Sequence, residues 1–345
     1  MNRKQKKLLL YLAGAVVLLL AVLLLVVGIK SKKAKQEEAA EESTSITEVR
    51  PYSSLTYNNG SATLSFTLGE DGNWIWADDP DFPLDDMNVG VIVDLISSIK
   101  PQQTITDGDT LEAYGLDQPS MTLTATSAED GSTLRIALGK TTTDGKSYYM
   151  MMNDDESTVY IIADALSQRL IVPIYDMMKL PELPVLTADN LVSVTVEGTA
   201  STVLTAQRPE SPDKGASSAD GTEEGTTDES AVTWRSGGAN VTDDPTVTAF
   251  LDELSQVELL GCVDFKPTEE AVSICGFDAP TAVLTAKYLG DGTAEQTFTL
   301  TIGGALPGDD ADGDYYARID GDTTIYRINN NRIEKLLALA ESGLE

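Results

Sequence analysis

One six-residue phrase occurs twice in this sequence, and its recurrence restricts the possible folds more than any other feature. "YGLDQP" stands at 114–119 and "CGFDAP" at 275–280, each followed by a strand-like run. The glycine can take the left-handed conformation that ends a helical turn. The Asp-x-Pro sequence then leads into a strand, because the residue before proline avoids the α region. We interpret the phrase as a structural corner used once per repeated unit, in preference to a binding loop, and expect Leu116 and Phe277 to plug into the core.

Strand patterns repeat in the same order around the two corners. Residues 54–67 and 193–206 both have the alternating apolar pattern of a strand, a turn and a second strand. After each corner comes a hairpin with an Asp-Gly turn, at 130–131 and 291–292. A second hairpin then carries a Tyr-Tyr pair in each copy. By alternation one ring of each pair faces the core, and the other is available for a glycan or protein contact.

Helical patterns also recur, before the corner and at the end of each copy. Residues 87–99 and 245–257 have apolar residues at helical spacing. The expected core positions are Val91, Leu95 and Ile99 in the first segment, and Phe250, Leu254 and Val257 in the second. Asp243 or Asp244 is expected to cap the second helix, with Pro245 at its first position. Together these patterns predict two tandem α+β copies, 51–186 and 187–345, each an antiparallel sheet with two main helices.

The second copy contains an insertion at 208–230. This segment consists mainly of Pro, Gly, Ser, Asp, Glu and Thr, without a large apolar residue, and we expect it to be disordered. It stands where the first copy has the tight turn 69–72. A surface hairpin loop tolerates such growth, because the entropy of loop closure rises slowly with length.

The N-terminal region predicts a membrane anchor. Leu8–Ile29 is an uncharged run of 22 residues, long enough for an α-helix that crosses a bilayer. A cleaved signal peptide has a shorter apolar core and a small-x-small site after it, so we expect an uncleaved signal-anchor. Residues 1–7 are then a cytoplasmic tail, and the acidic stretch within 30–50 is a juxtamembrane linker.

The orientation of this anchor depends on a small difference in positive charge between its two flanks. Four basic residues stand on each side of the apolar run, and the free α-amino group adds a charge to the N-terminal side. We therefore expect a single-pass protein of the cell membrane with its C-terminal domains extracytoplasmic. Its predicted contact with lipid is through residues 8–29.

Composition excludes several classes of function. Residues 1–35 hold 8 of the 24 basic residues and none of the 55 acidic ones, so the rest of the chain is strongly acidic and should repel nucleic acid. The chain has no histidine, which removes histidine-based catalysis and the commonest zinc ligand. Its two cysteines, Cys262 and Cys275, either form a disulfide or are two buried free thiols, since spacing alone does not decide this.

Candidate site motifs are few and incomplete. The alternating carboxylates Asp310, Asp312 and Asp314 resemble part of a calcium loop, but Gly321 stands where its terminal Glu belongs. We expect a solvated hairpin loop there, with calcium as the alternative. "GKT" at 139–141 resembles the end of a phosphate-binding loop, but Leu134 replaces the required first glycine, so a strand-end turn is expected. No residue is assigned as catalytic, and no cofactor is predicted.

The repeated corners, the "ALG" and "TIGG" strand ends and the leading apolar segment together resemble a bacterial family of membrane-anchored domains of unknown function. The segment 174–196, which joins the copies, is also similar to that family. Its members are often encoded beside ABC-type transporters of the gliding-motility kind. The resemblance implies an accessory or interaction protein of an ABC-type transport or envelope complex, with a membrane or envelope protein as partner. A carboxylate-dependent cell-envelope hydrolase is the alternative.

Overall fold

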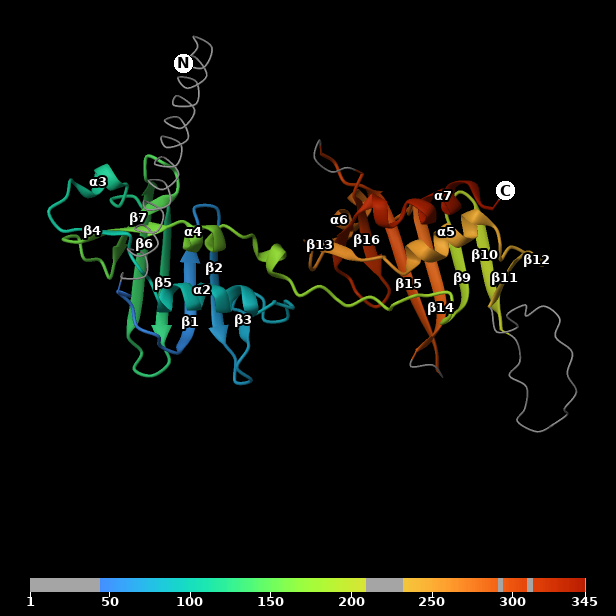
Figure 1. Cartoon of the computed structure of the whole chain (residues 1–345), viewed down its shortest axis with the longest axis horizontal. Coiled ribbons are helices and arrows are strands. Elements are labelled where there is room, and N and C mark those ends of the chain that lie inside the picture. The colour runs from blue at the N-terminus through green and yellow to red at the C-terminus, as the bar shows by residue number, and fades with distance from the viewer. Residues whose placement is uncertain (1–43, 209–231, 291–293, 309–312, 345) are drawn as a thin grey trace, which may run out of the picture. The chain divides into compact units, whose positions relative to one another are not determined.

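The computed structural model describes residues 44–208, 232–290, 294–308 and 313–344 (Figure 1). The predicted tail 1–7, the predicted transmembrane helix 8–29 and, apart from Arg208 at its start, the predicted insertion 208–230 lie outside these ranges. Within these ranges no helix has the length and apolarity needed to cross a membrane. The chain divides into two compact units, one ending at Val172 and the other beginning at Pro173.

The first unit is built on an eight-stranded antiparallel sheet with the strand order β3-β2-β1-β5-β6-β7-β8-β4. Its strands are β1 (Tyr52–Asn58), β2 (Thr63–Leu68), β3 (Trp74–Trp76), β4 (Gln103–Ile105), β5 (Met121–Ser127), β6 (Thr133–Thr141), β7 (Ser147–Met152) and β8 (Val159–Ala163). Its helices are α2 (Met87–Ser97), α3 (Leu111–Tyr114) and α4 (Ala165–Leu170). In Figure 1, α2 and α4 lie over the strands, and they pack against each other.

The second unit is built on a nine-stranded antiparallel sheet with the order β12-β11-β10-β9-β14-β15-β16-β17-β13. Its strands are β9 (Leu191–Glu197), β10 (Ser201–Gln207), β11 (Thr233–Ser236), β12 (Ala239–Asn240), β13 (Leu259–Asp264), β14 (Ala282–Gly290), β15 (Ala294–Ala305), β16 (Tyr315–Ile319) and β17 (Ile325–Ile328). Its helices are α5 (Pro245–Leu254), α6 (Glu269–Ile274) and α7 (Glu334–Ser342), with 3-10 turns η1 (Ile174–Met177) and η2 (Asn330–Arg332). Helix α7 packs on β9, β10 and β14, and α5 packs on α7.

The two strand orders correspond one to one once β12 is set aside, as the repeat in the sequence predicts. The predicted α+β class, with antiparallel sheets and a few helices in each half, is confirmed. The unit boundary differs from the expected one, since residues 173–186 were assigned to the first copy. They fall in the second unit, where η1 packs against β13.

The insertion lies between two neighbouring strands. Gln207 at the end of β10 pairs with Thr233 at the start of β11, so the inserted segment connects two paired antiparallel strands. At the same place in the first unit, the N–H of Gly69 donates to the carbonyl oxygen of Asn73 at 2.8 Å and closes a tight turn. The predicted position of the insertion is confirmed.

The two predicted helices before the corners both form, but the core face of the first was predicted only in part, since Ile99 is buried as expected and Leu95 is half-buried. Helix α2 buries Val89, Ile92 and Ile96, whereas Val91 is 37% exposed. This segment is apolar on several faces, so two stripes fit a helical period and the sequence does not choose between them.

Helix α5 ends at Leu254, short of the predicted end at 257, so the expected core residue Val257 lies beyond it and is half-buried. Phe250 and Leu254 are buried. Of the two candidate caps, Asp244 accepts a hydrogen bond from the N–H of Thr246 at 2.8 Å, with Pro245 as the first helical residue.

Each predicted corner packs its turn against an irregular point of the sheet. Gly115 ends α3 in the left-handed region with φ +69°, and Gly276 follows α6 with φ +84°. The pairing of β6 with β7 shifts between Leu138 and Thr141, and that of β15 with β16 shifts between Ile302 and Ala305. Both shifts fall where a corner meets the sheet, which explains why the "ALG" and "TIGG" strand ends recur together with the corners.

Candidate functional site

The face of the first sheet that points away from the helices carries mainly hydroxyl groups. Leu55, Phe66 and Leu123 are buried on the helix side, so by alternation their strand neighbours point the other way. Two rows of paired residues cross β2, β1, β5 and β6 on this side: Ser65–Thr56–Thr124–Arg135 and Thr67–Ser54–Thr126–Thr133. These eight residues, with Thr122, are called the hydroxyl face below. All of them are exposed or half-buried.

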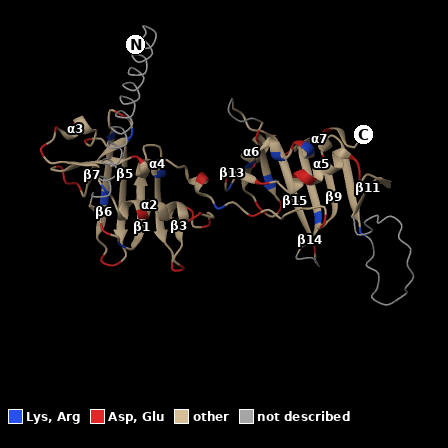
Figure 2. Cartoon of the chain, viewed as in Figure 1, with Lys and Arg blue, Asp and Glu red and all other residues tan. Residues whose placement is uncertain are grey.

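The strands that form the centre of the hydroxyl face are uncharged. β1, β2 and β5 contain no Asp, Glu, Lys or Arg, although the chain has 55 acidic residues. Figure 2 shows that most acidic residues of this unit lie in its loops and turns, while the strands are largely free of them. The uncharged centre of the hydroxyl face is therefore surrounded by acidic loops.

The same face of the second sheet has a similar row of residues. Val203, Thr195, Thr285 and Thr299 follow one another across β10, β9, β14 and β15. The neighbouring row pairs Thr301 with Arg318 on β16. A hollow of about 300 Å³ opens at this end of the face. It is lined by Phe277, Thr299, Thr301, Arg318, Ile319, Asp320, Gly321 and Asp322.

Arg318 is the main polar group of this hollow. Its guanidinium carbon lies 5.6 Å from the centre of the Phe277 ring, within the range of a cation–π contact. Its Nε atom is buried and has no hydrogen-bond partner among the described residues. Phe277 is half-buried here, whereas its counterpart Leu116 is buried as expected.

Asp322 carries the negative charge beside Arg318. The Tyr326 hydroxyl donates to its Oδ2 at 2.6 Å, and the N–H of Thr324 donates to its Oδ1 at 2.8 Å. Burial alone would raise the pKa of Asp322, but these hydrogen bonds and the charge of Arg318 outweigh it and lower the pKa. Asp322 is therefore ionised at neutral pH and already bound within the fold.

A second hollow, of about 290 Å³, lies where the chain enters the first unit. The N–H of Ile46 donates to the carbonyl oxygen of Ile99, and the N–H of Ile99 donates to Oγ1 of Thr47, both at 2.9 Å. These bonds fix residues 44–50 to the end of the segment that follows α2. The end of the predicted linker 30–50 is thus part of the first unit.

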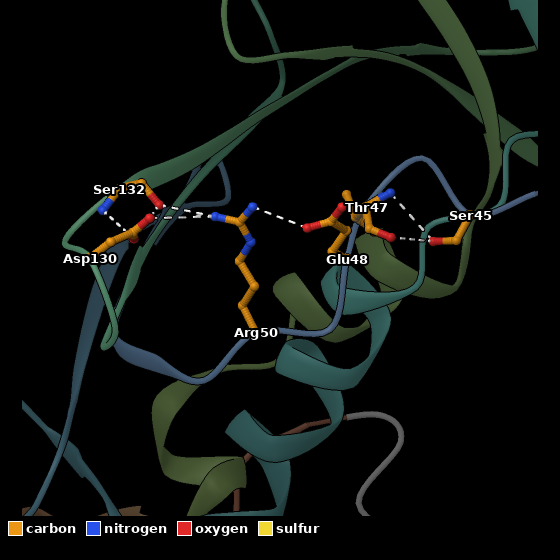
Figure 3. Close-up of polar contacts among 6 residues, drawn as sticks. All are labelled: Ser45, Thr47, Glu48, Arg50, Asp130 and Ser132. Carbon is orange, nitrogen blue, oxygen red and sulfur yellow. Dashed lines mark hydrogen bonds and ion pairs between the residues drawn. The ribbon is translucent and has the colours of Figure 1, made fainter.

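Arg50 joins this entering segment to the β5–β6 hairpin (Figure 3). Its Nη2 donates to Oε2 of Glu48 at 3.1 Å, and its Nη1 donates to Oγ of Ser132 at 3.3 Å. Nη1 also lies 3.8 Å from Oδ2 of Asp130. Hydrogen bonds from Ser132 and the charge of Arg50 lower the pKa of Asp130 to about 2. Because Arg50 is already paired with two carboxylates, its role in this hollow is to hold the segment in place.

Of the three calcium candidates, the structure describes one. Asp314 is buried, Nδ2 of Asn329 donates to its Oδ1 at 2.8 Å, and Nε of Arg327 lies 3.5 Å from its Oδ2. Asp310 and Asp312 lie outside the described residues. In the part of the chain that is described, no three His, Cys, Asp or Glu side chains gather as a metal ion would require. Asp314 links β16 to the segment after β17, a role that alternation of carboxylates in the sequence does not reveal.

One tyrosine of each Tyr-Tyr pair contacts the corner of its own copy. The rings of Tyr149 and Tyr114 lie 4.8 Å apart, and in the second unit Tyr316 lies beside Cys275, which stands where Tyr114 stands in the first. These rings serve packing between the corner and the sheet.

Both cysteines are buried free thiols, which decides between the two alternatives that the sequence leaves open. Burial, with added repulsion from Asp264, Asp322 and Asp176, raises the pKa of Cys262 to about 12. A thiol with this pKa is almost fully protonated at neutral pH, so Cys262 is a poor nucleophile and a poor metal ligand.

Glu253 on α5 is the one carboxyl group, among the residues described, whose pKa is clearly raised. Burial causes the shift, and backbone donors oppose it. The N–H groups of Lys335 and Leu336 donate to its carboxylate at 2.9–3.0 Å. Glu253 therefore satisfies the free N–H groups at the start of α7, a structural role that its raised pKa alone would not distinguish from catalysis.

Comparison with protein-family models matches residues 74–280 to a domain of unknown function, DUF4340. The matched region begins at β3 of the first unit and ends with the corner of the second. No curated protein and no solved structure matches the chain.

Proposed function

The chain belongs to the DUF4340 family, and we propose that it is a membrane-anchored extracytoplasmic interaction protein that holds a protein of an ABC-type transport or envelope complex. The observation that carries this proposal is the hydroxyl face of the first unit, whose central strands β1, β2 and β5 are uncharged and whose surrounding loops are acidic. The anchor is the apolar run 8–29, and the class of partner follows from the resemblance described above.

The chemistry of the hydroxyl face suits binding to a flat, neutral surface. Each Thr or Ser hydroxyl both donates and accepts, so one array can satisfy either kind of group on a partner. The branched threonine side chain has few rotamers and loses little entropy when it is ordered at an interface. Burying neutral hydroxyls requires less desolvation than burying charges. The acidic loops then restrict orientation, because a partner must keep its own acidic groups away from them.

The membrane segment offers a second contact with the same complex. Ala13, Gly14 and Ala15 form a run of small residues in the apolar stretch. Small residues allow close approach of helices within a bilayer. We therefore assign the helix 8–29 a role in docking on the membrane helices of a transporter, in addition to anchoring.

The test is co-purification of the full-length protein after extraction in a mild detergent. We expect membrane transport subunits in the complex, and weaker recovery when residues 8–29 are replaced by an unrelated anchor. The double variant Thr56→Lys/Thr122→Lys puts two charges on the hydroxyl face at exposed positions. It should reduce recovery at least about tenfold, as interface charges without partners commonly do. Thr143→Lys, at an exposed loop position of the same unit, is the matched control and should leave recovery unchanged.

Two results contradict the proposal. The first is equal recovery of the same subunits by wild type, Thr56→Lys/Thr122→Lys and the anchor-replaced chain. The second is a protein that purifies alone and turns over a cell-wall substrate, with activity abolished by a single Asp or Glu substitution. The second result would favour the carboxylate-dependent hydrolase.

A further inference from the structure

The hollow at Arg318 has a role that the proposed docking of the first unit does not use. Arg318 lies on β16, and the strand pairing places it beside Thr301 on β15. Thr299, two residues earlier on β15, points to the same face. A guanidinium fork and two hydroxyl groups therefore line one side of a hollow of about 300 Å³. This volume is at the lower end of the range for small-molecule sites.

The Arg318 side chain is held in place but is not satisfied. The Phe277 ring stands over the guanidinium, and the corner fixes the ring, which lies 3.2 Å from the position of a Cβ on Gly303. Nε of Arg318 is buried and has no hydrogen-bond partner among the described residues. The planar guanidinium of a pre-positioned arginine matches the two-oxygen geometry of a carboxylate.

The acidic residues of the hollow restrict which anion it accepts. Asp322 is ionised and bonded to Tyr326, and Asp320 stands exposed at the rim. Two carboxylates beside one arginine repel a phosphate dianion. They favour a ligand whose single negative charge is accompanied by a positive one.

The first unit provides an internal comparison. In the first unit, Ala137 stands at the position of Thr301, and its strand partner Met151 stands at the position of Arg318. Leu116 stands at the position of Phe277. The repeat thus retains the corner in both copies, whereas the arginine, the threonine and the aromatic ring occur together only in the second. Maintaining the fold does not require them, because the first unit forms the same corner without them.

We propose that the second unit binds a small zwitterion of the amino-acid class in this hollow, with its carboxylate on Arg318, Thr299 and Thr301 and its ammonium group facing Asp320. Alanine and glycine are the smallest members of this class. This site is independent of the docking proposed for the hydroxyl face.

Binding is tested on the full-length protein in detergent, by titration with glycine, D-alanine, L-alanine, acetate, methylamine and inorganic phosphate. Chemical shifts of the Arg318 Nε–H and of nearby amides report occupancy. We expect saturable shifts with at least one of the three amino acids, and at least tenfold weaker binding of acetate, methylamine and phosphate. Arg318→Met introduces the residue of the first copy and should abolish the saturable shifts. Arg169→Met, at an exposed position on α4 of the first unit, is the matched control and should leave them unchanged.

Two further variants separate the parts of the site. Asp320→Asn should weaken amino-acid binding at least fivefold while leaving acetate binding unchanged. Phe277→Leu, which also introduces the residue of the first copy, should weaken binding several-fold, and it replaces Arg318→Met if that variant does not fold. The proposal is overturned if none of the amino acids gives saturable shifts, or if Arg318→Met or its replacement binds as wild type does. It is equally overturned if acetate or phosphate binds as tightly as the amino acids and Asp320→Asn has no effect, since the site would then take simple anions.

Discussion

The N–H of Gly304 donates a hydrogen bond to the carbonyl oxygen of Cys275 at 2.8 Å, and this bond fastens the second corner to the sheet. Its neighbour Gly303 allows the approach, because a Cβ on Gly303 would lie 2.3 Å from the same oxygen. The first unit has the same arrangement, with a Cβ on Gly139 placed 2.2 Å from the carbonyl oxygen of Tyr114. In both units, therefore, the corner packs against a glycine of the sheet, which is called the receiving glycine below.

Replacing either receiving glycine, Gly139 or Gly303, by alanine should destabilise the unit in which it lies. In Gly139→Ala and Gly303→Ala the new Cβ meets a backbone oxygen, which cannot move away as a side chain would. We expect each variant to lose about 2–3 kcal/mol of unfolding free energy, as in overpacked cores. Urea unfolding, followed by probes specific to each unit, measures the loss.

A third strand glycine supplies the matched control. A Cβ on Gly261 in β13 would meet no atom within 4 Å. Gly261→Ala should leave stability unchanged or raise it by up to about 1 kcal/mol, because alanine loses less entropy on folding. Equal losses in all three variants would mean that the close approach to the corner is not the cause.

The receiving glycines mark the limit of what the sequence predicted. Gly115 and Gly276 were found because a left-handed turn before Asp-x-Pro is a local pattern, and local patterns are visible in a sequence. Gly139 belonged to "GKT" and was interpreted as a strand-end turn, whereas it lies within β6. A glycine is needed there because the position lies against the carbonyl oxygen of Tyr114, 25 positions earlier. A periodic sequence pattern does not reveal such a contact.

The candidate site was less accessible to prediction than the fold. Thr299, Thr301 and Arg318 come together through the register of β15 and β16, and Phe277 joins them from the corner. None of these residues forms a motif along the chain. A signal existed in the comparison of the copies, since Arg318 stands where the first copy has Met151.

Removal of the inserted loop should leave the second unit intact. Deletion of 209–229 retains Arg208, whose Nη2 donates to the carbonyl oxygens of Asp189 at 2.8 Å and Leu191 at 2.6 Å. We expect the unfolding free energy to change by less than about 1 kcal/mol, because the deleted segment has almost no apolar surface to bury. Calorimetry of both chains measures this.

The deletion is compared with Arg208→Ala in the full-length chain. It removes two charge-assisted hydrogen bonds, so it should cost more than the deletion, about 1–3 kcal/mol. A larger loss on deletion than on Arg208→Ala would show that the loop packs against the unit.

Glu253 should make the stability of the second unit depend on pH. Its pKa is raised in the folded state above the ordinary value of 4.5, so the folded protein binds more protons than the unfolded chain in the interval between the two values. The contribution of Glu253 is therefore greatest below pH 4.5 and falls as the pH rises through the folded pKa. Glu253→Gln retains an acceptor for the N–H groups of Lys335 and Leu336 and should remove this decline.

Glu253→Ala separates the hydrogen bonds from the titration. It leaves the start of α7 without its acceptor and should lower the unfolding free energy by about 1–2 kcal/mol below pH 4.5, as for a lost helix cap. Like Glu253→Gln, it should show no decline as the pH rises, so its difference from wild type should shrink. Unfolding free energies between pH 4 and 8 distinguish the variants. A decline of the same size in wild type and in Glu253→Gln would assign the pH dependence to other groups.

The Cys262 thiol should react slowly in the folded protein. Its pKa of about 12 leaves on the order of 0.01% thiolate at pH 8, and thiolate is the reactive form. In a Cys275→Ala background, alkylation by iodoacetamide should be at least about a hundredfold slower in buffer than in 8 M urea. A native rate close to the rate in urea would mean that Cys262 is exposed and ionises normally.

Arg50 and Asp130 provide a test of how the entering segment is fastened. Hydrogen bonds from Ser132 and the charge of Arg50 lower the pKa of Asp130 to about 2, so its contribution is present above the ordinary value of 3.8 and is lost as the pH falls toward 2. The pair is exposed, and such pairs contribute little to global stability. We therefore expect Arg50→Ala to act locally, with faster hydrogen exchange at the amides of Ile46 and Ile99 and little change in global unfolding.

The control for this prediction is Arg135→Ala, which removes an exposed ion pair with Asp154 elsewhere in the same unit. It should leave the exchange of the Ile46 and Ile99 amides unchanged. Unchanged exchange in Arg50→Ala would show that the backbone bonds of Ile46 and Ile99 hold the segment without the arginine.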